Sequence, residues 1–334
     1  MAKVKNERRM AKGRKFIGLM VILMAMIGCQ NTPEVEVRTH ECAAMPAGRA
    51  SACTCVLDGK AYVFGGRDAA GLYQNDLWLY DAQTDTWTGL GTTPLKARVN
   101  ATMTALDGKL YVGLGYSAIH AYNDSAYQKD WWEYTPATGT WKRLADFPNA
   151  NTVAASSYGI DGTVYALYGF GYGFTRDIYR YDVSADTWTF VPEHTPRAWT
   201  NFGGRGALCQ GRLYFGLGYR TENLTQWYEV DLPSDIWQKR RSLPGKGREF
   251  SACAATNEYV YILGGRYFGG DLTGGEVFDT YMRYMPEKDN WELCGKMPCG
   301  RAENQIAFSI DGKVYFGLGE NENGQVINQL YRID

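Results

Sequence analysis

Arginine and aromatic side chains recur near glycine-rich points of the chain, where they could bind an anion or a sugar. A guanidinium group presents a planar fork of donors that suits a carboxylate, a sulfate or a phosphate. An aromatic face suits a sugar ring. The residues concerned are Arg49, Arg67, Arg98, Tyr116, Tyr219, Arg248, Arg266 and Arg301. Alternatively, these arginines brace neighbouring parts of the fold through acids such as Glu249 and Glu303, and the sequence favours neither interpretation.

Composition argues against two other classes of site. The chain has only three histidines, which leaves little material for a His-rich metal centre, so we expect no metal and no cofactor. It has 35 Lys plus Arg against 36 Asp plus Glu, a formal net charge of −1. Such a balance argues against a nucleic-acid partner held by bulk electrostatics.

The elements that must position these side chains form a repeated unit. An apolar segment that carries Tyr and ends in Gly occurs six times. The copies are AYVFGG (61–66), LYVGLG (110–115), VYALYG (164–169), LYFGLG (213–218), VYILGG (260–265) and VYFGLG (314–319). Four of the six follow an Asp-Gly dipeptide, which is a strong signal for a hairpin between two strands.

A second hairpin follows within each of the first five units. A Tyr or Val lies seven residues before a Trp, with a polar turn between them, at Tyr80 and Trp87, Tyr134 and Trp141, Tyr181 and Trp188, Val230 and Trp237, and Tyr284 and Trp291. Each unit is therefore four short antiparallel strands, and the tryptophans are interpreted as packing residues. One such sheet cannot bury both of its faces, but six sheets arranged radially around an axis can.

These units resemble kelch repeats, in which a glycine-rich strand end is followed by a Tyr and then a Trp. The resemblance covers residues 37–334, and it implies an all-β, six-bladed kelch-type β-propeller. A full double glycine occurs only at Gly65-Gly66 and Gly264-Gly265. Gly-Leu-Gly replaces it in three of the other units, which weakens any assignment to a subfamily.

The last blade is expected to be closed by the N-terminal strand. QLYRID (329–334) matches DIYRYD (177–182), the third strand of the third unit, and the printed sequence ends there. VRTHECAAMPAGR (37–49) aligns with DNWELCGKMPCGR (289–301), so the missing fourth strand lies at the other end of the sequence. Closure of the ring would remove exposed sheet edges.

In a four-stranded blade, the loops after strands two and four emerge on the same face of the ring. The first set of loops begins at Arg67, Tyr116, Phe170, Tyr219, Arg266 and Glu320. The second set carries Arg49, Arg98, Arg248 and Arg301, with Arg197 and Arg205 near the equivalent place in repeat four. Residues 116–130 and 266–280 are longer than a tight hairpin needs, and loops of that kind often carry binding. This loop face is the predicted binding face.

The N-terminus is predicted to be an export signal and a lipid anchor. A basic segment precedes the apolar run Phe16–Ile27, which is short for a membrane span but typical of a signal peptide. Gly28-Cys29 follows and resembles a bacterial lipobox, so 1–28 would be removed and Cys29 lipidated. An ordinary signal peptide with a chance Cys is the alternative. Residues 29–36 are interpreted as a polar tether, and the protein as anchored in the bacterial cell envelope, on the periplasmic or surface face.

Seven cysteines besides Cys29 remain in this disulfide-permissive setting, an odd number that cannot all pair within one molecule. Cys294 and Cys299 bracket a short turn and are the expected local disulfide.

The kelch resemblance implies two enzyme classes. Copper-radical oxidases related to galactose oxidase use two His, two Tyr and a Cys–Tyr crosslink, but His40, His120 and His194 are scattered over different blades. The sialic acid mutarotases, or N-acetylneuraminate epimerases, rely on a Glu and an Arg at the channel mouth. That resemblance implies Glu320 or Glu222, with Arg220, Arg67 or Arg266, as the catalytic residues. Sugar ring opening needs only one proton donor and one acceptor.

The leading functional hypothesis is an exported, lipid-anchored propeller that acts as a binding module. It would bind a saccharide, in particular an acidic one, or a partner protein at its arginine- and aromatic-lined loop face. The alternative is a mutarotase or epimerase acting on N-acetylneuraminate or a related sugar.

Overall fold

The computed structural model describes residues 32–118, 124–148, 153–170, 177–193, 197, 202–269 and 275–334. The predicted signal peptide and Cys29 lie outside the described residues. Residues Thr32–Asp334 form one compact unit. Within its described part, no helix has the length and apolar character needed to cross a membrane.

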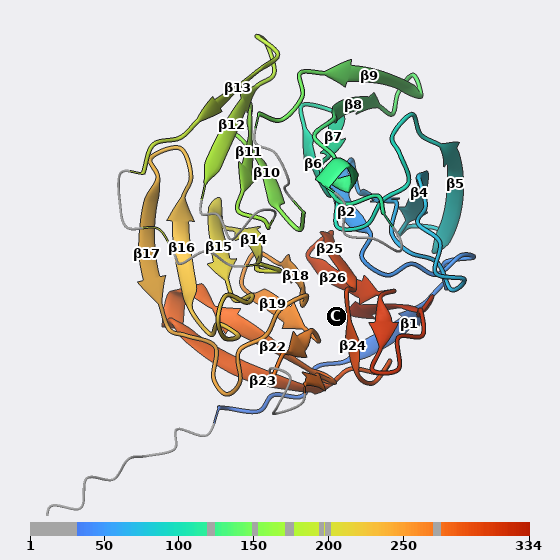
Figure 1. Cartoon of the computed structure of the whole chain (residues 1–334). Helices are drawn as coiled ribbons and strands as arrows, with labels where there is room; N and C mark the ends of the chain where they lie inside the picture. Colours follow the sequence, from blue (N-terminus) through green and yellow to red (C-terminus); the bar gives the residue numbers. More distant parts are fainter. Residues whose placement is uncertain are drawn as a thin grey trace, which may run out of the picture. The chain divides into compact units, whose positions relative to one another are not determined.

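The described residues form six four-stranded antiparallel sheets, which are the blades of a ring (Figure 1). Blade one contains β2 (Cys53–Leu57), β3 (Lys60–Phe64), β4 (Asp76–Asp81) and β5 (Thr86–Thr92). Blade two contains β6 (Thr102–Leu106), β7 (Lys109–Gly113), β8 (Trp131–Thr135) and β9 (Thr140–Leu144). Blade three contains β10 (Ser156–Ile160), β11 (Thr163–Leu167), β12 (Ile178–Asp182) and β13 (Thr187–Phe190).

The second half of the ring repeats this order. Blade four contains β14 (Arg205–Cys209), β15 (Arg212–Gly216), β16 (Trp227–Asp231) and β17 (Ile236–Arg240). Blade five contains β18 (Ala252–Ala255), β19 (Val260–Leu263), β22 (Thr280–Met285) and β23 (Asn290–Lys296). Blade six contains β25 (Ile306–Ile310), β26 (Lys313–Gly317), β28 (Leu330–Ile333) and β1 (Thr39–Cys42).

Short elements complete the description. Two-residue strands pair at the loop face, β20 (Arg266–Tyr267) with β21 (Glu276–Val277) and β24 (Ala302–Glu303) with β27 (Glu320–Asn321). Single 3-10 turns occur at η1 (Asp124–Ala126) and η2 (Pro286–Lys288). The six-bladed all-β architecture predicted from the repeats is confirmed.

The N-terminal strand closes the ring, as predicted. β1 pairs antiparallel with β28, Thr39 opposite Ile333 and Cys42 opposite Leu330. Part of the segment predicted as a tether also lies against the ring. The Val35 N–H donates to the Leu293 carbonyl at 2.9 Å, and the Leu293 N–H donates to the Pro33 carbonyl at 2.8 Å.

The hydrophobic core lies between adjacent blades, where inner and middle strands pack their apolar side chains. Blades two and three, for example, share a cluster that includes Tyr111, Trp131 and Tyr181. The recurrent Tyr and Trp belong to this packing, since the Tyr80 and Trp87 ring centroids are 5.0 Å apart. The Trp87 Nε1 donates to the Ala43 carbonyl, in the segment that follows β1, at 2.8 Å. These tryptophans therefore join neighbouring blades, as the sequence interpretation held.

A ring of backbone hydrogen bonds surrounds the channel at the loop face. In each blade, one residue ahead of the innermost strand has a positive φ, between 51° and 68°. These residues, here called the hoop, are Ser51, Asn100, Ala154, Gly203, Phe250 and Asn304. Five hydrogen bonds of 2.9–3.1 Å run from an N–H of one hoop residue to the carbonyl of the hoop residue in the preceding blade. The hoop fixes the spacing of the side chains beside it.

Candidate functional site

Twelve residues just outside the hoop form the mouth of the channel. In every blade, the residue before the hoop position pairs antiparallel with the residue that follows the strand-two glycine. The pairs are Ala50 with Arg67, Val99 with Tyr116, Val153 with Phe170, Phe202 with Tyr219, Glu249 with Arg266, and Glu303 with Glu320. The mouth therefore has an aromatic half in blades two to four and a charged half in blades five, six and one.

The glycines of the repeat allow these close pairings. Gly66 has a φ of +89°, and a Cβ there would lie 2.8 Å from the Ala50 carbonyl oxygen. Gly265 has a φ of +86°, and a Cβ there would lie 2.6 Å from the Glu249 carbonyl oxygen. Both the left-handed conformation and the approach of the two segments require glycine. The glycine pattern that defines the repeat thus positions the mouth residues directly.

In the charged half, each arginine lies beside an acid of a neighbouring blade. Arg67 Nη2 forms an ion pair with Glu320 Oε2, and the Asn304 side-chain amide donates to Glu320 Oε1 at 2.9 Å. Arg266 Nη1 lies 3.4 Å from Glu303 Oε1. Glu303 Oε2 and Arg266 Nε are buried, and neither has a hydrogen-bond partner within the described residues. The charged half is therefore incompletely satisfied, a state that a polar ligand could complete.

Two carboxyl groups of this half, those of Glu249 and Glu303, have a raised pKa because they are buried. Burial raises the pKa of Glu249 to about 7, against the opposing charge of Arg266 and with support from Glu303. Burial likewise raises the pKa of Glu303 to about 7, opposed by Arg266 and supported by Glu320. Carboxyls with such a pKa exist in both protonation states at pH 7, which general acid–base chemistry requires.

The aromatic half offers half-buried rings that contact one another. The ring centroids of Phe170 and Phe202 are 5.3 Å apart, and those of Phe202 and Phe250 are 5.0 Å apart. Tyr116 meets Tyr127 at 5.0 Å, in an edge-to-face arrangement. Such rings present flat apolar surface with limited conformational freedom, which suits stacking against the apolar face of a sugar.

Three of the predicted binding arginines are buried in the blades and do not face the mouth. Arg49 Nη2 lies 2.6 Å from Asp76 Oδ2, and Arg98 binds both carboxylate oxygens of Asp130 at 2.6 and 2.9 Å. Arg248 lies 4.0 Å from the centroid of the Phe278 ring and donates to the Gly264 carbonyl at 3.2 Å. Bracing describes these three residues, although Asp76 and Asp130 supply the carboxylates for two of them, rather than Glu249 and Glu303.

The remaining predicted residues are divided between the mouth and the outer surface. Arg67, Tyr116, Tyr219, Arg266 and Glu320 belong to the twelve mouth residues. Arg301 is exposed and is not one of the twelve, but it lines a groove together with the mouth residue Arg266, and its Nη1 donates to the Val277 carbonyl at 2.8 Å. Glu222 is exposed in a turn in which the Arg220 N–H donates to the Glu222 carbonyl at 3.1 Å. Glu222 and Arg220 are thus separate from the twelve.

The structure also bears on the cysteines and histidines. Cys294 and Cys299 are free thiols, so the expected disulfide between them is not formed. His40 Nε2 lies 2.5 Å from Asp334 Oδ2 at the closing strands, while His120 and His194 lie outside the described residues. Among the residues that are described, no group of three or more His, Cys, Asp or Glu could hold a metal ion.

Sequence reasoning missed Glu249, Glu303, Phe202 and Asn304 as residues of this face. A signal for them was present, because each is adjacent to or part of the hoop position of its repeat. That position becomes recognisable only when its backbone conformation is known. The sequence analysis offered Glu249 and Glu303 as bracing partners, and Glu303 does pair with Arg266 of the neighbouring blade at 3.4 Å, at the mouth itself.

Comparison with known proteins identifies several that are similar to this chain. A family model described as the KLHDC2/KLHL20/DRC7 Kelch-repeats domain matches residues 27–216. Kelch-like protein 25 of Xenopus tropicalis is 26% identical over 301 residues, which cover 86% of this chain and 48% of that protein. The chain thus spans about half the length of this curated relative.

A curated bacterial protein and a solved structure are also similar to this chain. An N-acetylneuraminate epimerase of Salmonella enteritidis PT4 is 32% identical over 92 residues, covering 27% of this chain and 23% of that protein. A solved structure titled "Structure of YjhT" aligns with a TM-score of 0.72 and 16% identity, covering 86% of this chain and 96% of that one. At that identity, the structural likeness establishes the fold alone.

Proposed function

Because the chain belongs to the Kelch-repeat family, we propose that its propeller binds a saccharide that carries an acidic group, and that it does so at the mouth of the channel. The observation that carries this proposal is the division of the mouth. One half of the mouth carries aromatic rings, and the other half carries guanidinium and carboxyl groups, all beside the same hoop. An acidic substituent can accept from the guanidinium group of Arg266, whose side chain is 39% exposed.

Replacing Tyr219 with alanine is expected to weaken saccharide binding by about tenfold, because stacking area at the mouth is lost. Isothermal titration calorimetry with N-acetylneuraminate, glucuronate and glucose measures this change. Phe190→Ala is the matched control, since Phe190 is an exposed aromatic residue on the outer strand β13. Equal losses in both variants, or no saturable heat with any sugar, would contradict the proposal. The absence of saturable heat with any sugar would favour a partner protein as the ligand instead.

A second candidate function is sugar mutarotation, favoured by the two carboxyls whose pKa is about 7. One carboxylate would accept the proton of the anomeric hydroxyl while the other, protonated, delivers a proton to the ring oxygen. The bond between the anomeric carbon and the ring oxygen then breaks, and closure on the other face reverses both transfers. The partial match to an N-acetylneuraminate epimerase supports testing that sugar first.

Glu303→Gln is expected to slow enzyme-dependent α/β interconversion of N-acetylneuraminate by about 100-fold, the usual scale of one acid–base group. Exchange NMR on the free sugar gives the rate. Glu258→Gln, in the exposed hairpin turn between β18 and β19, should leave the rate unchanged. Wild-type protein that does not accelerate interconversion would end this candidate, while the binding proposal would stand or fall on calorimetry.

A further inference from the structure

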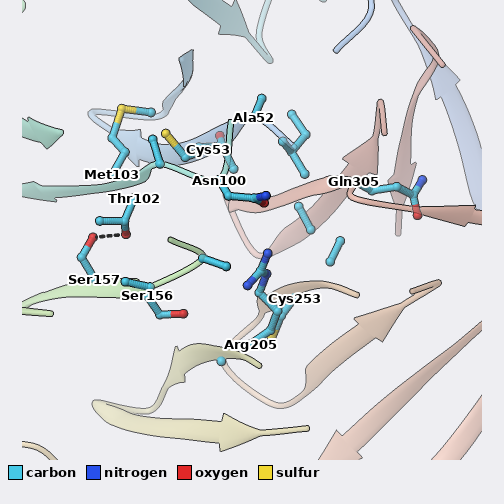
Figure 2. A pocket seen from close by; sticks show the side chains of 18 of the residues that line it. Ala52, Cys53, Asn100, Thr102, Met103, Ser156, Ser157, Arg205, Cys253 and Gln305 are labelled. Carbon is cyan, nitrogen blue, oxygen red and sulfur yellow. Dashed lines mark hydrogen bonds between the residues drawn. The ribbon is translucent and has the colours of Figure 1, made fainter. Parts of the chain in front are cut away.

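Below the hoop, the channel widens into a cavity of about 170 Å³ lined by residues from the inner strands of the blades (Figure 2). The hoop residues Asn100 and Ala154 line it on the mouth side. A second cavity of about 310 Å³ shares Thr54, Ser157 and Cys253 with the first, so the channel continues toward the opposite face. A cavity of about 150 Å³ can hold a benzene-sized molecule, which sets the size of ligand that fits.

The lining of the first cavity is neutral except at one residue. The first residue of each inner strand is among its lining residues, and by strand register these six are Cys53, Thr102, Ser156, Arg205, Ala252 and Ile306. Five blades place a small or apolar side chain there, and blade four places an arginine. Figure 2 shows the guanidinium group of Arg205 directed into the middle of the cavity. Among the described lining residues, Arg205 alone carries a charge.

Arg205 differs from the bracing arginines in its partners. Its Nη1 donates to the Gly204 carbonyl at 2.9 Å, and within the described residues it forms no ion pair. Arg49 and Arg98, and likewise the buried Arg197, each have a carboxylate oxygen within 2.8 Å, whereas Arg248 resembles Arg205 in forming no ion pair within the described residues. A guanidinium group has five N–H donors, so most of those of Arg205 remain available to the cavity. Arg205 is half-buried, and a partly buried cation without a counter-ion is stabilised by an anion that binds beside it.

The other titratable groups around Arg205 do not neutralise it fully. Burial raises the pKa of the Tyr158 hydroxyl and of the Cys253 thiol, so both are uncharged at pH 7. The carboxyl whose charge acts on Arg205 is that of Glu249, which favours the charged form of the arginine. Glu249 packs close to Gly203, two residues before the arginine, since a Cβ at Gly203 would lie 3.3 Å from the Glu249 Cβ. Glu249 is itself shared with Arg266, the residue with which it pairs at the mouth.

We propose that Arg205 forms an anion site inside the channel, which takes a carboxylate-sized group. The anion accepts from the free N–H groups of Arg205, and the small hydroxyl and alanine side chains of the other blades leave room for it. The anion could come from two sources. One is a free small carboxylate, and the other is the acidic end of a saccharide bound at the mouth. Only the second source rests on the proposed function.

The test measures binding of lactate and glucuronate to the whole chain in detergent and chloride-free buffer, by NMR titration. Wild-type protein is expected to bind lactate saturably, and Arg205→Ser to bind it at least about tenfold more weakly. Serine occupies the same register position in blade three, so this variant should fold, which its thermal unfolding curve checks. Arg205→Lys should keep part of the affinity. Arg143→Ser removes an exposed arginine of β9 and should bind as wild type.

Each outcome decides one proposal. Saturable lactate binding that is lost in Arg205→Ser, without any response to glucuronate or N-acetylneuraminate, supports the channel site while the saccharide proposal fails. Glucuronate binding that is equal in wild type and Arg205→Ser supports the saccharide proposal and overturns the channel site. The channel site is also overturned if wild-type protein binds neither lactate nor inorganic phosphate.

Discussion

Replacing Arg98 with alanine is expected to lower the free energy of unfolding by about 3–5 kcal/mol. Arg98 is fully buried, binds Asp130 through both carboxylate oxygens, and donates to the Leu114 carbonyl at 3.0 Å. Burial alone would raise the pKa of Asp130, but the hydrogen bonds and charge of Arg98 outweigh burial and hold that pKa below its usual range. Without Arg98, a largely buried carboxylate loses its counter-charge. Urea unfolding at pH 7 measures the change.

The matched control for this prediction is Arg143→Ala. Arg143 pairs with Asp146 at 2.7 Å, but the two side chains are 56% and 51% exposed, so solvent screens them. Its loss should cost less than about 1 kcal/mol. A double variant, Arg98→Met with Asp130→Leu, should be more stable than Arg98→Ala, because no unpaired charge remains. Equal effects of Arg98→Ala and Arg143→Ala would show that the buried pair does not brace the blade.

Glu303→Gln is expected to change how the stability of the propeller depends on pH. In the folded protein the pKa of Glu303 is raised to about 7, whereas an unfolded glutamate titrates near its ordinary value of about 4.3. The folded state therefore binds more protons between these values, and this contribution to stability is lost as pH rises through about 7. The glutamine variant lacks this loss. Relative to wild type, it should gain about 3–4 kcal/mol between pH 4 and pH 8.

Denaturant unfolding of both proteins at a series of pH values gives the difference directly. Glu258→Gln serves as the control, because Glu258 is exposed in a turn and its replacement should shift the curve little at any pH. Parallel stability curves for wild type and Glu303→Gln would mean that Glu303 titrates as an ordinary surface acid. The acid–base role suggested for the mouth would then lose its basis.

The fold was predictable because its signals are local and repeated. A glycine such as Gly66 or Gly265 ends strand two because the backbone there has a positive φ and approaches a neighbouring segment closely. The tryptophans recur because each blade packs against the next in the same way. The alignment of 37–49 with 289–301 even located the closing strand β1. Such patterns report on backbone geometry and burial, which each repeat must solve in the same way.

The mouth was only partly predictable because its chemistry depends on partners that are distant in sequence. Arg67 and Glu320 are separated by 253 positions, yet they form an ion pair across the junction of blades one and six. Arg98 and Arg248 occupy the same place in their repeats. Blade two supplies Asp130 to the first, whereas blade five has Thr280 in that position and Arg248 lies on Phe278 instead. A repeat pattern does not reveal which of its arginines meets a carboxylate.

The hoop has an electrostatic consequence for selectivity. Its five hydrogen bonds run along the circumference, each from an N–H of one blade to a carbonyl of the preceding blade. Peptide dipoles arranged head to tail around a circle largely cancel on the axis, unlike those of a helix, whose aligned dipoles favour anions at the N-terminus. The backbone of the hoop therefore contributes little electrostatic preference for either sign of charge in the channel. Polarity is set by side chains such as Glu249, Arg266 and Arg205, so one substitution at a register position can reverse it while the frame stays unchanged.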